Sequence, residues 1–222
     1  MKTITLFGDS ILYGIVVNPD NLKYAKCPDY DLRQVGANFD YDLLNISQMG
    51  RNTSEAIMVV KEYLTRHPAP EYAIIEFGGN DCNRDWGKIQ NGGSGEVKIP
   101  IDEFCKNIKT SIDLLHSHGT KVALMNMPPV ESLPFLDFVS TSDSGKATIK
   151  AFLGDVEQIY INHENYSKAI EALATELNIP CIDIRSAFSK PYSDYLCVDG
   201  VHPNQKGYQL IKEKLIEYLK SL

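Results

Sequence analysis

The chain has 222 residues, of which 43% are hydrophobic and 23% are charged, and its formal net charge is −7. These values are typical of an ordinary globular protein with a sizeable core, and we expect a single domain over residues 1–222. The acidic balance and the lack of a long basic run argue against nucleic acid or an anionic membrane surface as the main partner.

The sequence carries no visible signal for secretion or for membrane insertion. Met1-Lys2 leads directly into an apolar run, and no apolar segment approaches the ~20 residues that a membrane span needs. The cysteines are odd in number and have no metal-like spacing, so we expect free thiols in a reducing compartment, the cytoplasm. They are Cys27, Cys82, Cys105, Cys181 and Cys197. The oligomeric state is not indicated.

Five short apolar runs are predicted to be buried strands, and they alternate with helices. The expected strands are residues 3–7, 41–46, 72–77, 121–125 and 180–184. The expected helices, which show apolar residues at three- and four-residue spacing, are 52–67, 104–115, 166–177 and 208–222. This alternation is typical of an α/β fold, in which a five-stranded parallel sheet lies between two helical layers in a three-layer sandwich.

Three segments interrupt this alternation. Residues 18–31 are polar and rich in turn residues, and residues 82–100 contain Gly92-Gly93-Ser94-Gly95, so we predict a loop in each. Residues 130–156 mix apolar pairs with a small, polar stretch and are expected to form a partly ordered excursion, with 133–139 as a lid. Long loops in compact domains are usually functional or mobile.

Four chemistry-bearing segments follow predicted strands or precede the last helix. They contain Ser10, Gly50, Asn80 and the stretch Asp199-Gly200-Val201-His202. Right-handed crossovers bring the carboxyl ends of parallel strands to one edge of the sheet, where ligands bind in open α/β folds. We therefore expect these segments to meet there.

Ser10 is the candidate nucleophile, since a serine hydroxyl becomes reactive when a base lies within hydrogen-bond reach. Asp199 and His202 supply a base and its partner. A spacing of three residues with Gly200 inside allows the carboxylate to fold back onto Nδ1 of the imidazole, and Nε2 is then free to face Ser10. Asp9 is expected to hold the turn before Ser10 through local hydrogen bonds.

Three donors are available for the oxyanion of a tetrahedral intermediate. They are the backbone N–H groups of Ser10 and Gly50 and the side-chain amide of Asn80. Gly50 suits close approach because it has no side chain. This mechanism requires no metal and no cofactor.

Each of these residues also has a plainer interpretation. Ser10 can cap a helix, Gly50 can serve only as a turn residue, Asn80 can form an Asx turn, and His202 can be a surface loop residue. Together they favour one site, because they occur in the order and at the strand ends that a single site demands.

Four sequence blocks resemble those of the SGNH hydrolase superfamily, also called GDSL-type lipases and esterases. The blocks are Phe7-Gly8-Asp9-Ser10-Ile11, Gly50 within residues 45–53, Gly78-Gly79-Asn80-Asp81, and Asp199-Gly200-Val201-His202-Pro203-Asn204. The resemblance spans residues 4–208, although only at the blocks. It implies a five-stranded, flavodoxin-like parallel sheet, with Ser10 as nucleophile, His202 as base and Asp199 as its partner. It also implies an oxyanion hole of Ser10, Gly50 and Asn80. Gln48-Met49 is bulkier than the small residues often found there.

We therefore predict a serine esterase that acts on a small-molecule ester and removes a short acyl group, such as acetyl, from a carbohydrate or another polar alcohol. Tyr13, Arg51, Asp81 and Trp86 are the candidate substrate contacts, and Trp86 offers a face for stacking on a sugar ring.

A lysophospholipase or thioesterase with a longer acyl pocket is the main alternative. An acyltransferase or a non-catalytic binding module on the same fold are the others. Signatures of α/β-hydrolase elbows, phosphate loops, dinucleotide sites and zinc proteases are absent.

Overall fold

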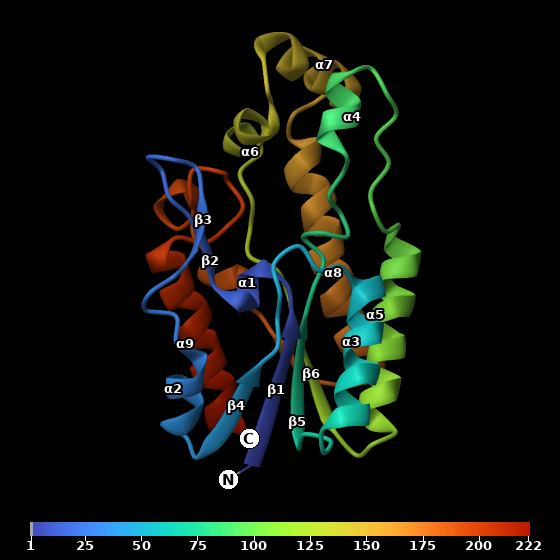
Figure 1. Ribbon diagram of the computed structural model, residues 1–222, viewed down its shortest axis with the longest axis vertical. Helices are drawn as coiled ribbons and strands as arrows, with labels where there is room; N and C mark the ends of the chain where they lie inside the picture. The colour runs from blue at the N-terminus through green and yellow to red at the C-terminus, as the bar shows by residue number, and fades with distance from the viewer. Residues whose placement is uncertain (1) are drawn as a thin grey trace.

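The computed structural model describes residues 2–222. A five-stranded sheet forms its centre, and Figure 1 shows this sheet between helices. The strands are all parallel and lie in the order β4-β1-β5-β6-β7. They are β1 (Lys2–Gly8), β4 (Tyr41–Asn45), β5 (Tyr72–Glu76), β6 (Lys121–Met125) and β7 (Cys181–Ile182). In chain order this is 2-1-3-4-5, the flavodoxin-like arrangement of doubly wound folds. The predicted fold class is thus confirmed.

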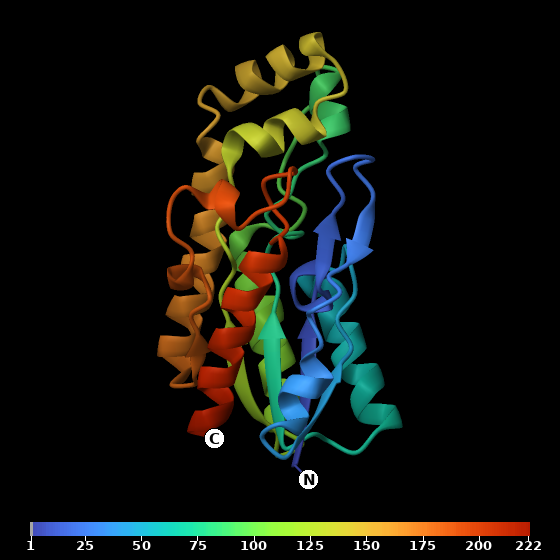
Figure 2. The same cartoon turned by 90° about the vertical axis from the view of Figure 1, so that its left-hand side faces the viewer.

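Helices cover both faces of the sheet (Figures 1 and 2). One face packs against α2 (Leu32–Ala37) and α9 (Gln205–Ser221), and the other against α3 (Thr53–Arg66), α5 (Ile101–His116) and α8 (Gln158–Leu177). Alternation along β1 explains the two cores, since successive side chains of a strand point to opposite faces. Leu6 joins the α9 side and Phe7 the α3 side.

The helix starts follow local sequence signals. Asn52 accepts hydrogen bonds from the backbone N–H groups of Ser54 and Glu55, and the Glu55 carboxylate accepts one from the Asn52 N–H. This capping box begins α3 where the sequence predicts it. Asn204 caps α9 through its side-chain oxygen, which accepts hydrogen bonds from the N–H groups of Lys206 and Gly207, so this helix starts at the end of the loop that carries His202.

The segments predicted as loops contain more regular structure than expected. A hairpin of β2 (Ile15–Val17) and β3 (Tyr24–Lys26) precedes α2, and α4 (Trp86–Gln90) lies within residues 82–100. The 130–156 excursion consists of α6 (Ser132–Val139) and α7 (Asp143–Leu153), which corrects the prediction of partial order. Pro134 is tolerated because it lies in the first turn of α6, where no intrahelical N–H is needed. Two 3₁₀ turns, Arg185–Ala187 and Tyr192–Asp194, follow β7.

The helices α4, α6 and α7 form a cap with the first turns of α8, above the carboxyl ends of the strands (Figures 1 and 2). The buried residues of the cap make a third apolar cluster, which contains Trp86, Ile89, Val130, Leu136, Ile149 and Ile159. The start of β1 and the end of α9 lie at the opposite end of the molecule (Figure 1). The cap therefore encloses the edge of the sheet where the candidate residues were expected.

Two further expectations concern the cysteines and the helices. All five cysteines are free, as predicted. Across residues 2–222, no helix combines the length and the apolar character that crossing a membrane requires.

Candidate active site

Ser10 is the first residue of the short helix α1 (Ser10–Tyr13), directly after β1. Asp9 caps this helix, because its Oδ1 accepts a hydrogen bond from the Ile11 N–H at 2.9 Å. Gly8 allows the close approach of neighbouring segments, since a Cβ there would lie 2.9 Å from the Leu12 side chain and 3.0 Å from the Glu76 carbonyl oxygen. The tight turn thus presents the Ser10 hydroxyl at the mouth of β1.

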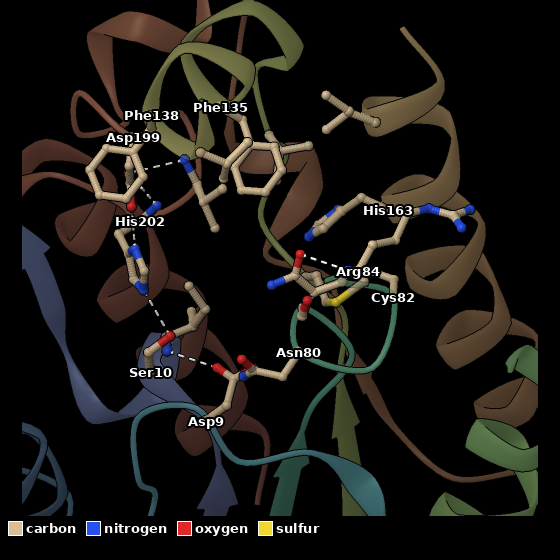
Figure 3. Close-up of a pocket in the computed structure, with 18 of the residues that line it drawn as sticks. Asp9, Ser10, Asn80, Cys82, Arg84, Phe135, Phe138, His163, Asp199 and His202 are labelled. Carbon is tan, nitrogen blue, oxygen red and sulfur yellow. Dashed lines mark hydrogen bonds and ion pairs between the residues drawn. The ribbon is translucent and has the colours of Figure 1, made fainter. Parts of the chain in front are cut away.

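Ser10, His202 and Asp199 form one hydrogen-bonded chain (Figure 3). The Ser10 Oγ lies 2.9 Å from Nε2 of His202, and Nδ1 of the same ring lies 2.5 Å from Oδ2 of Asp199. The other carboxylate oxygen, Oδ1, accepts hydrogen bonds from the backbone N–H groups of Val201 and His202, each at 3.1 Å. Both oxygens of Asp199 are therefore engaged, and the ring is held with Nε2 toward the hydroxyl.

Gly200 has a conformation that this loop requires. Its φ is +69°, in the left-handed region, and an added Cβ would lie 2.7 Å from the Glu131 carbonyl oxygen and 2.9 Å from the Phe135 nitrogen. The Gly200 carbonyl also accepts a hydrogen bond of 2.8 Å from the Glu131 N–H. Glycine therefore allows the Asp199–His202 loop to pack directly against the start of α6.

The candidate oxyanion donors differ in their availability. Within residues 2–222 the backbone N–H groups of Ser10 and Gly50 donate no hydrogen bond, and the space where a Gly50 Cβ would lie is open. The Asn80 amide instead donates to Asp9 Oδ2 at 3.1 Å and to the Arg51 carbonyl at 3.0 Å. Asn80 must therefore exchange one of these acceptors to bind an oxyanion, and its role stays a prediction.

A cavity of about 220 Å³ opens beside this hydrogen-bonded chain. Ser10, Gly50, Asn80, Asp199 and His202 all lie in its wall, so the structure brings the five predicted site residues together. Most of the remaining wall is apolar and comes from the cap and from the segment that follows β6. These apolar residues include Trp86, Met127, Val130, Phe135, Phe138, Val139, Leu153 and Ile159.

Trp86, predicted as a sugar-stacking residue, lines this cavity but is largely committed to packing. Its indole N–H donates to Oδ1 of Asn83 at 2.7 Å, and its ring meets Phe135 edge-on, with centroids 5.6 Å apart. The side chain is 9% exposed, so one broad face for stacking on a sugar is not available.

The other three predicted substrate contacts do not line the cavity. The Tyr13 ring lies under the ammonium group of Lys26. The Arg51 guanidinium binds the Ile46 carbonyl at 2.8 Å and the Gln48 side chain at 2.7 Å. Asp81 is buried and accepts hydrogen bonds from the backbone and the hydroxyl of Thr53. Contacts within the protein thus account for the positions of all three side chains.

Two carboxyl groups lie buried beneath the Ser10 turn. Glu76 ends β5 and is fully buried, and neither of its carboxyl oxygens has a hydrogen-bond partner among the described residues. Burial, and then the neighbouring Asp9 carboxyl, raises the pKa of Glu76 well above its ordinary value. Burial also raises the pKa of Asp9, to about 6. Of the two carboxyl groups, Glu76 therefore holds its proton to the higher pH.

Replacing Glu76 by glutamine should remove a loss of stability that the wild-type protein undergoes as the pH rises. A carboxyl whose pKa is raised on folding binds its proton more tightly in the folded state, so stability falls above the ordinary pKa of 4.5. Above about pH 6 Asp9 is largely ionised in both states, so of these two carboxyl groups only Glu76 still contributes to the slope, and the contributions of other groups cancel in the comparison with Glu76→Gln. The expected difference is about 1.4 kcal/mol per pH unit while Glu76 stays protonated in the folded protein.

Urea unfolding at several values between about pH 6 and pH 8 measures this slope. Glu103→Gln is the matched control, since Glu103 is exposed in the first turn of α5. Equal slopes for Glu76→Gln and the wild-type protein would show that Glu76 is ionised in the folded state.

Sequence reasoning did not identify Glu76 or His163 as residues of this site. Both line the cavity. A signal for Glu76 was available, because a single carboxylate at the end of an apolar strand is rarely buried without a purpose. His163 belongs to the first turns of α8, which begins eight residues before the predicted residue 166. The spacing of Ile159, His163 and Tyr166 indicates that earlier start.

A parallel sheet between helical layers, with a Ser–His–Asp hydrogen-bonded arrangement at its carboxyl edge, is typical of a serine hydrolase on a flavodoxin-like fold. The chain belongs to the GDSL-like Lipase/Acylhydrolase family, whose model matches residues 6–210. It is thus an ester hydrolase of the SGNH type, and the resemblance seen in the four sequence blocks is confirmed. No curated protein sequence matches the chain.

Solved structures share the fold over the whole chain. An aryl esterase from M. smegmatis has a TM-score of 0.72 and 18% identity, covering 100% of both chains. Est24, described as a carbohydrate acetylesterase from Sinorhizobium meliloti, has a TM-score of 0.71 and 14% identity, covering 100% of this chain and 99% of its own. A lipase/acylhydrolase from Enterococcus faecalis has a TM-score of 0.70 and 21% identity, covering 100% of this chain and 96% of its own.

Proposed function

We propose that the protein hydrolyses carboxylic esters through an acyl-enzyme on Ser10. The observation that carries this proposal is the hydrogen-bonded chain from Ser10 Oγ through His202 to Asp199, at the wall of a cavity large enough for a small ester. A serine hydroxyl in this setting has its base within reach, and the base has its orienting carboxylate.

In the first half-reaction, Ser10 Oγ attacks the carbonyl carbon and its proton passes to Nε2 of His202. The carbonyl oxygen becomes an oxyanion, which the free N–H groups of Ser10 and Gly50 stabilise, joined by the Asn80 amide after it releases one acceptor. When the intermediate collapses, the ester C–O bond breaks and the imidazolium returns the proton to the departing alcohol oxygen.

In the second half-reaction, a water molecule takes the place of the alcohol. Nε2 of His202 accepts a proton from this water as its oxygen attacks the acyl carbon, and a second tetrahedral intermediate forms. The bond between the acyl carbon and Ser10 Oγ then breaks, the proton returns to Oγ, and the carboxylic acid leaves. Throughout, Asp199 holds the imidazole and stabilises its protonated form.

We infer a substrate with a short acyl group on a polar alcohol, and the size of the cavity supports the short acyl group. At about 220 Å³ it is smaller than the ~300–1,000 Å³ typical of sites for drug-sized ligands. The phenyl rings of Phe135 and Phe138 narrow it above the nucleophile (Figure 3). Structures named as a carbohydrate acetylesterase and an acetyl-xylooligosaccharide esterase share the fold, and the choice of substrate rests on the cavity.

The acyl-length preference should be steep. With p-nitrophenyl esters from acetyl to palmitoyl, we expect kcat/KM to be highest for the shortest acyl groups and to fall by about tenfold or more before octanoyl, a difference of about 1.4 kcal/mol. The measurement is the initial rate of p-nitrophenol release, corrected for the rate without enzyme.

Other outcomes would replace this substrate assignment. A rate that rises with acyl length would favour a lysophospholipase or thioesterase, with α6 as the lid over a longer pocket. Release of p-nitrophenol that occurs only with an added alcohol, and yields a new ester, would identify an acyltransferase. Absence of reaction with every ester and alcohol would leave a binding module.

A further inference from the structure

The cavity has a polar end on the side away from His202. We use this name for Asn83, Asn162 and His163, which line the cavity together. Figure 3 shows Ser10 and His202 at the left of the cavity and His163 at the right, with Asn80 below, between Ser10 and His163. The polar end thus lies beyond the catalytic groups, and none of its three side chains has a role in the mechanism above.

Asn83 presents hydrogen-bond donors that its own surroundings fix in place. Its Oδ1 accepts hydrogen bonds from the Arg84 backbone N–H at 2.9 Å and from the Trp86 indole N–H at 2.7 Å. Both partners can only donate, so the amide cannot be turned around. The Asn83 Nδ2 hydrogens have no acceptor in the described part of the chain, although the residue lines the cavity.

Asn162 and His163, on neighbouring positions of α8, add an acceptor and an uncharged ring. The Asn162 Nδ2 donates a hydrogen bond to the Cys82 carbonyl at 2.9 Å. The Asn162 Oδ1 accepts no hydrogen bond from residues 2–222. His163 is only 7% exposed, and its buried Nδ1 has no partner there. Burial, and then the charge of Arg185, lowers the pKa of His163 to about 3, so its imidazole is neutral near neutral pH.

The charge around the polar end favours an uncharged ligand. Arg84 is the one cationic side chain in the cavity wall apart from the histidines, and its guanidinium donates to the Gly95 carbonyl and lies over the Phe152 ring. Figure 3 shows it extending past His163, away from Ser10. A carboxylate would meet the Asn162 oxygen without a cation to neutralise it, and an alkyl chain would leave the Asn83 donors unpaired.

We propose that the polar end is a subsite that hydrogen-bonds a hydroxyl group of the ester substrate. A hydroxyl both donates and accepts, so it can accept from Asn83 Nδ2 and donate to Asn162 Oδ1 or to a nitrogen of His163. The hydroxyl belongs either to the alcohol or to the acyl group. That the hydroxyl belongs to an ester rests on the proposed esterase function. That the ligand carries a hydroxyl rests on the unpaired donors and acceptors of the polar end.

The test uses two pairs of esters that share a carbon skeleton and differ only in hydroxyl groups. Propyl acetate against 2,3-dihydroxypropyl acetate places the hydroxyls on the alcohol, and ethyl butyrate against ethyl 3-hydroxybutyrate places one on the acyl group. The variants are Asn83→Asp, which keeps the acceptor for Trp86 but removes the donors, and His163→Phe, which keeps a ring. His116→Phe, at an exposed position of α5, is the matched control.

We expect the wild-type protein to favour the hydroxylated ester of at least one pair by about 10–100-fold in kcat/KM, the usual cost of leaving polar groups of a binding site without a hydrogen-bond partner. Each variant should reduce that preference toward unity, and the control should retain it. The pair that responds tells whether the hydroxyl comes from the alcohol or from the acyl group. Equal rates within both wild-type pairs, or a preference that survives in the folded variants, would overturn the subsite.

Binding to the Ser10→Ala protein separates this proposal from the esterase proposal. Calorimetric titration of both pairs gives affinity ratios without turnover, and a third variant that adds Asn83→Asp to Ser10→Ala shows whether the ratio depends on the polar end. If the wild-type protein hydrolyses no ester but the Ser10→Ala protein binds the hydroxylated member more tightly, the esterase proposal fails and the subsite stands. If esters are hydrolysed and the affinities within each pair are equal, the subsite fails alone.

Discussion

The Ser10→Ala variant should lose esterase activity by about 10³–10⁶-fold and keep its fold. The substitution removes only the Oγ that lies 2.9 Å from His202 Nε2, so no acyl-enzyme can form. The Asp9 carboxylate still caps α1 through the Ile11 N–H, because that bond does not involve the Ser10 side chain. The measurement is kcat on p-nitrophenyl acetate, with the melting temperature recorded for the same preparation.

Ser111→Ala is the matched control for this experiment. Ser111 is also buried, but it lies in α5 and its hydroxyl donates to the Asn107 carbonyl one turn earlier. Its loss should change the melting temperature slightly and the rate by less than about twofold. A folded Ser10→Ala protein with the activity of Ser111→Ala would rule out Ser10 as the nucleophile.

The sheet could be predicted from the sequence because its strands are buried on both sides. Such strands appear as short apolar runs, and β1, β5 and β6 are of this kind. Strand β7 shows the limit of that signal. The apolar run at 180–184 predicts five residues, but only Cys181 and Ile182 pair with β6, since the backbone then turns into a 3₁₀ helix at Arg185. Pairing depends on the neighbouring strand, which a single run does not reveal.

The candidate site could be predicted because strand order and loop position bring distant segments together. Ser10 and His202 are 192 positions apart in sequence, and each follows from a local pattern at the carboxyl edge. The hydrogen-bonding state of Asn80 could not be predicted in this way. It depends on the Arg51 carbonyl and the Asp9 carboxylate, whose distances from the amide are set by how three separate loops pack.

The cap was the least predictable part, because its helices are short and acquire stability from one another. Leu136 and Ile149 are fully buried between α6, α7 and the neighbouring loop segments, although neither helix shows a long periodic stripe. Helices of this length are marginal by themselves and form through tertiary packing. Of the substrate contacts predicted from sequence, only Trp86, which belongs to the cap, lines the cavity. Tyr13, Arg51 and Asp81 are held by partners outside the cap.

The Asp199–His202 loop contacts the cap through the backbone of Gly200. Its carbonyl binds the Glu131 N–H, and the close approach of the backbones leaves no room for a side chain. The position of His202 therefore depends on the segment that begins α6, which also supplies Phe135 and Phe138 to the cavity wall. The proposed base, His202, and the α6 residues that line the cavity are thus connected through this packed contact.

The Asp199→Asn variant should lower kcat by about 10⁴-fold with little change in fold. The two backbone N–H groups of Val201 and His202 donate to Oδ1, so the asparagine amide must place its oxygen there. Its NH₂ group then faces Nδ1 of His202, which has to accept. The ring proton moves to Nε2, and a protonated Nε2 cannot take the proton of the Ser10 hydroxyl.

This mechanism makes a spectroscopic prediction beside the kinetic one. Nitrogen-15 NMR of the imidazole should show the proton on Nδ1 in the wild-type protein and on Nε2 in Asp199→Asn. Asp194→Asn, at an exposed position of the preceding loop, should leave both the tautomer and the rate unchanged. An Asp199→Asn protein that keeps its proton on Nδ1 and still loses activity would show that Asp199 acts through its negative charge on the imidazolium rather than through the tautomer of the ring.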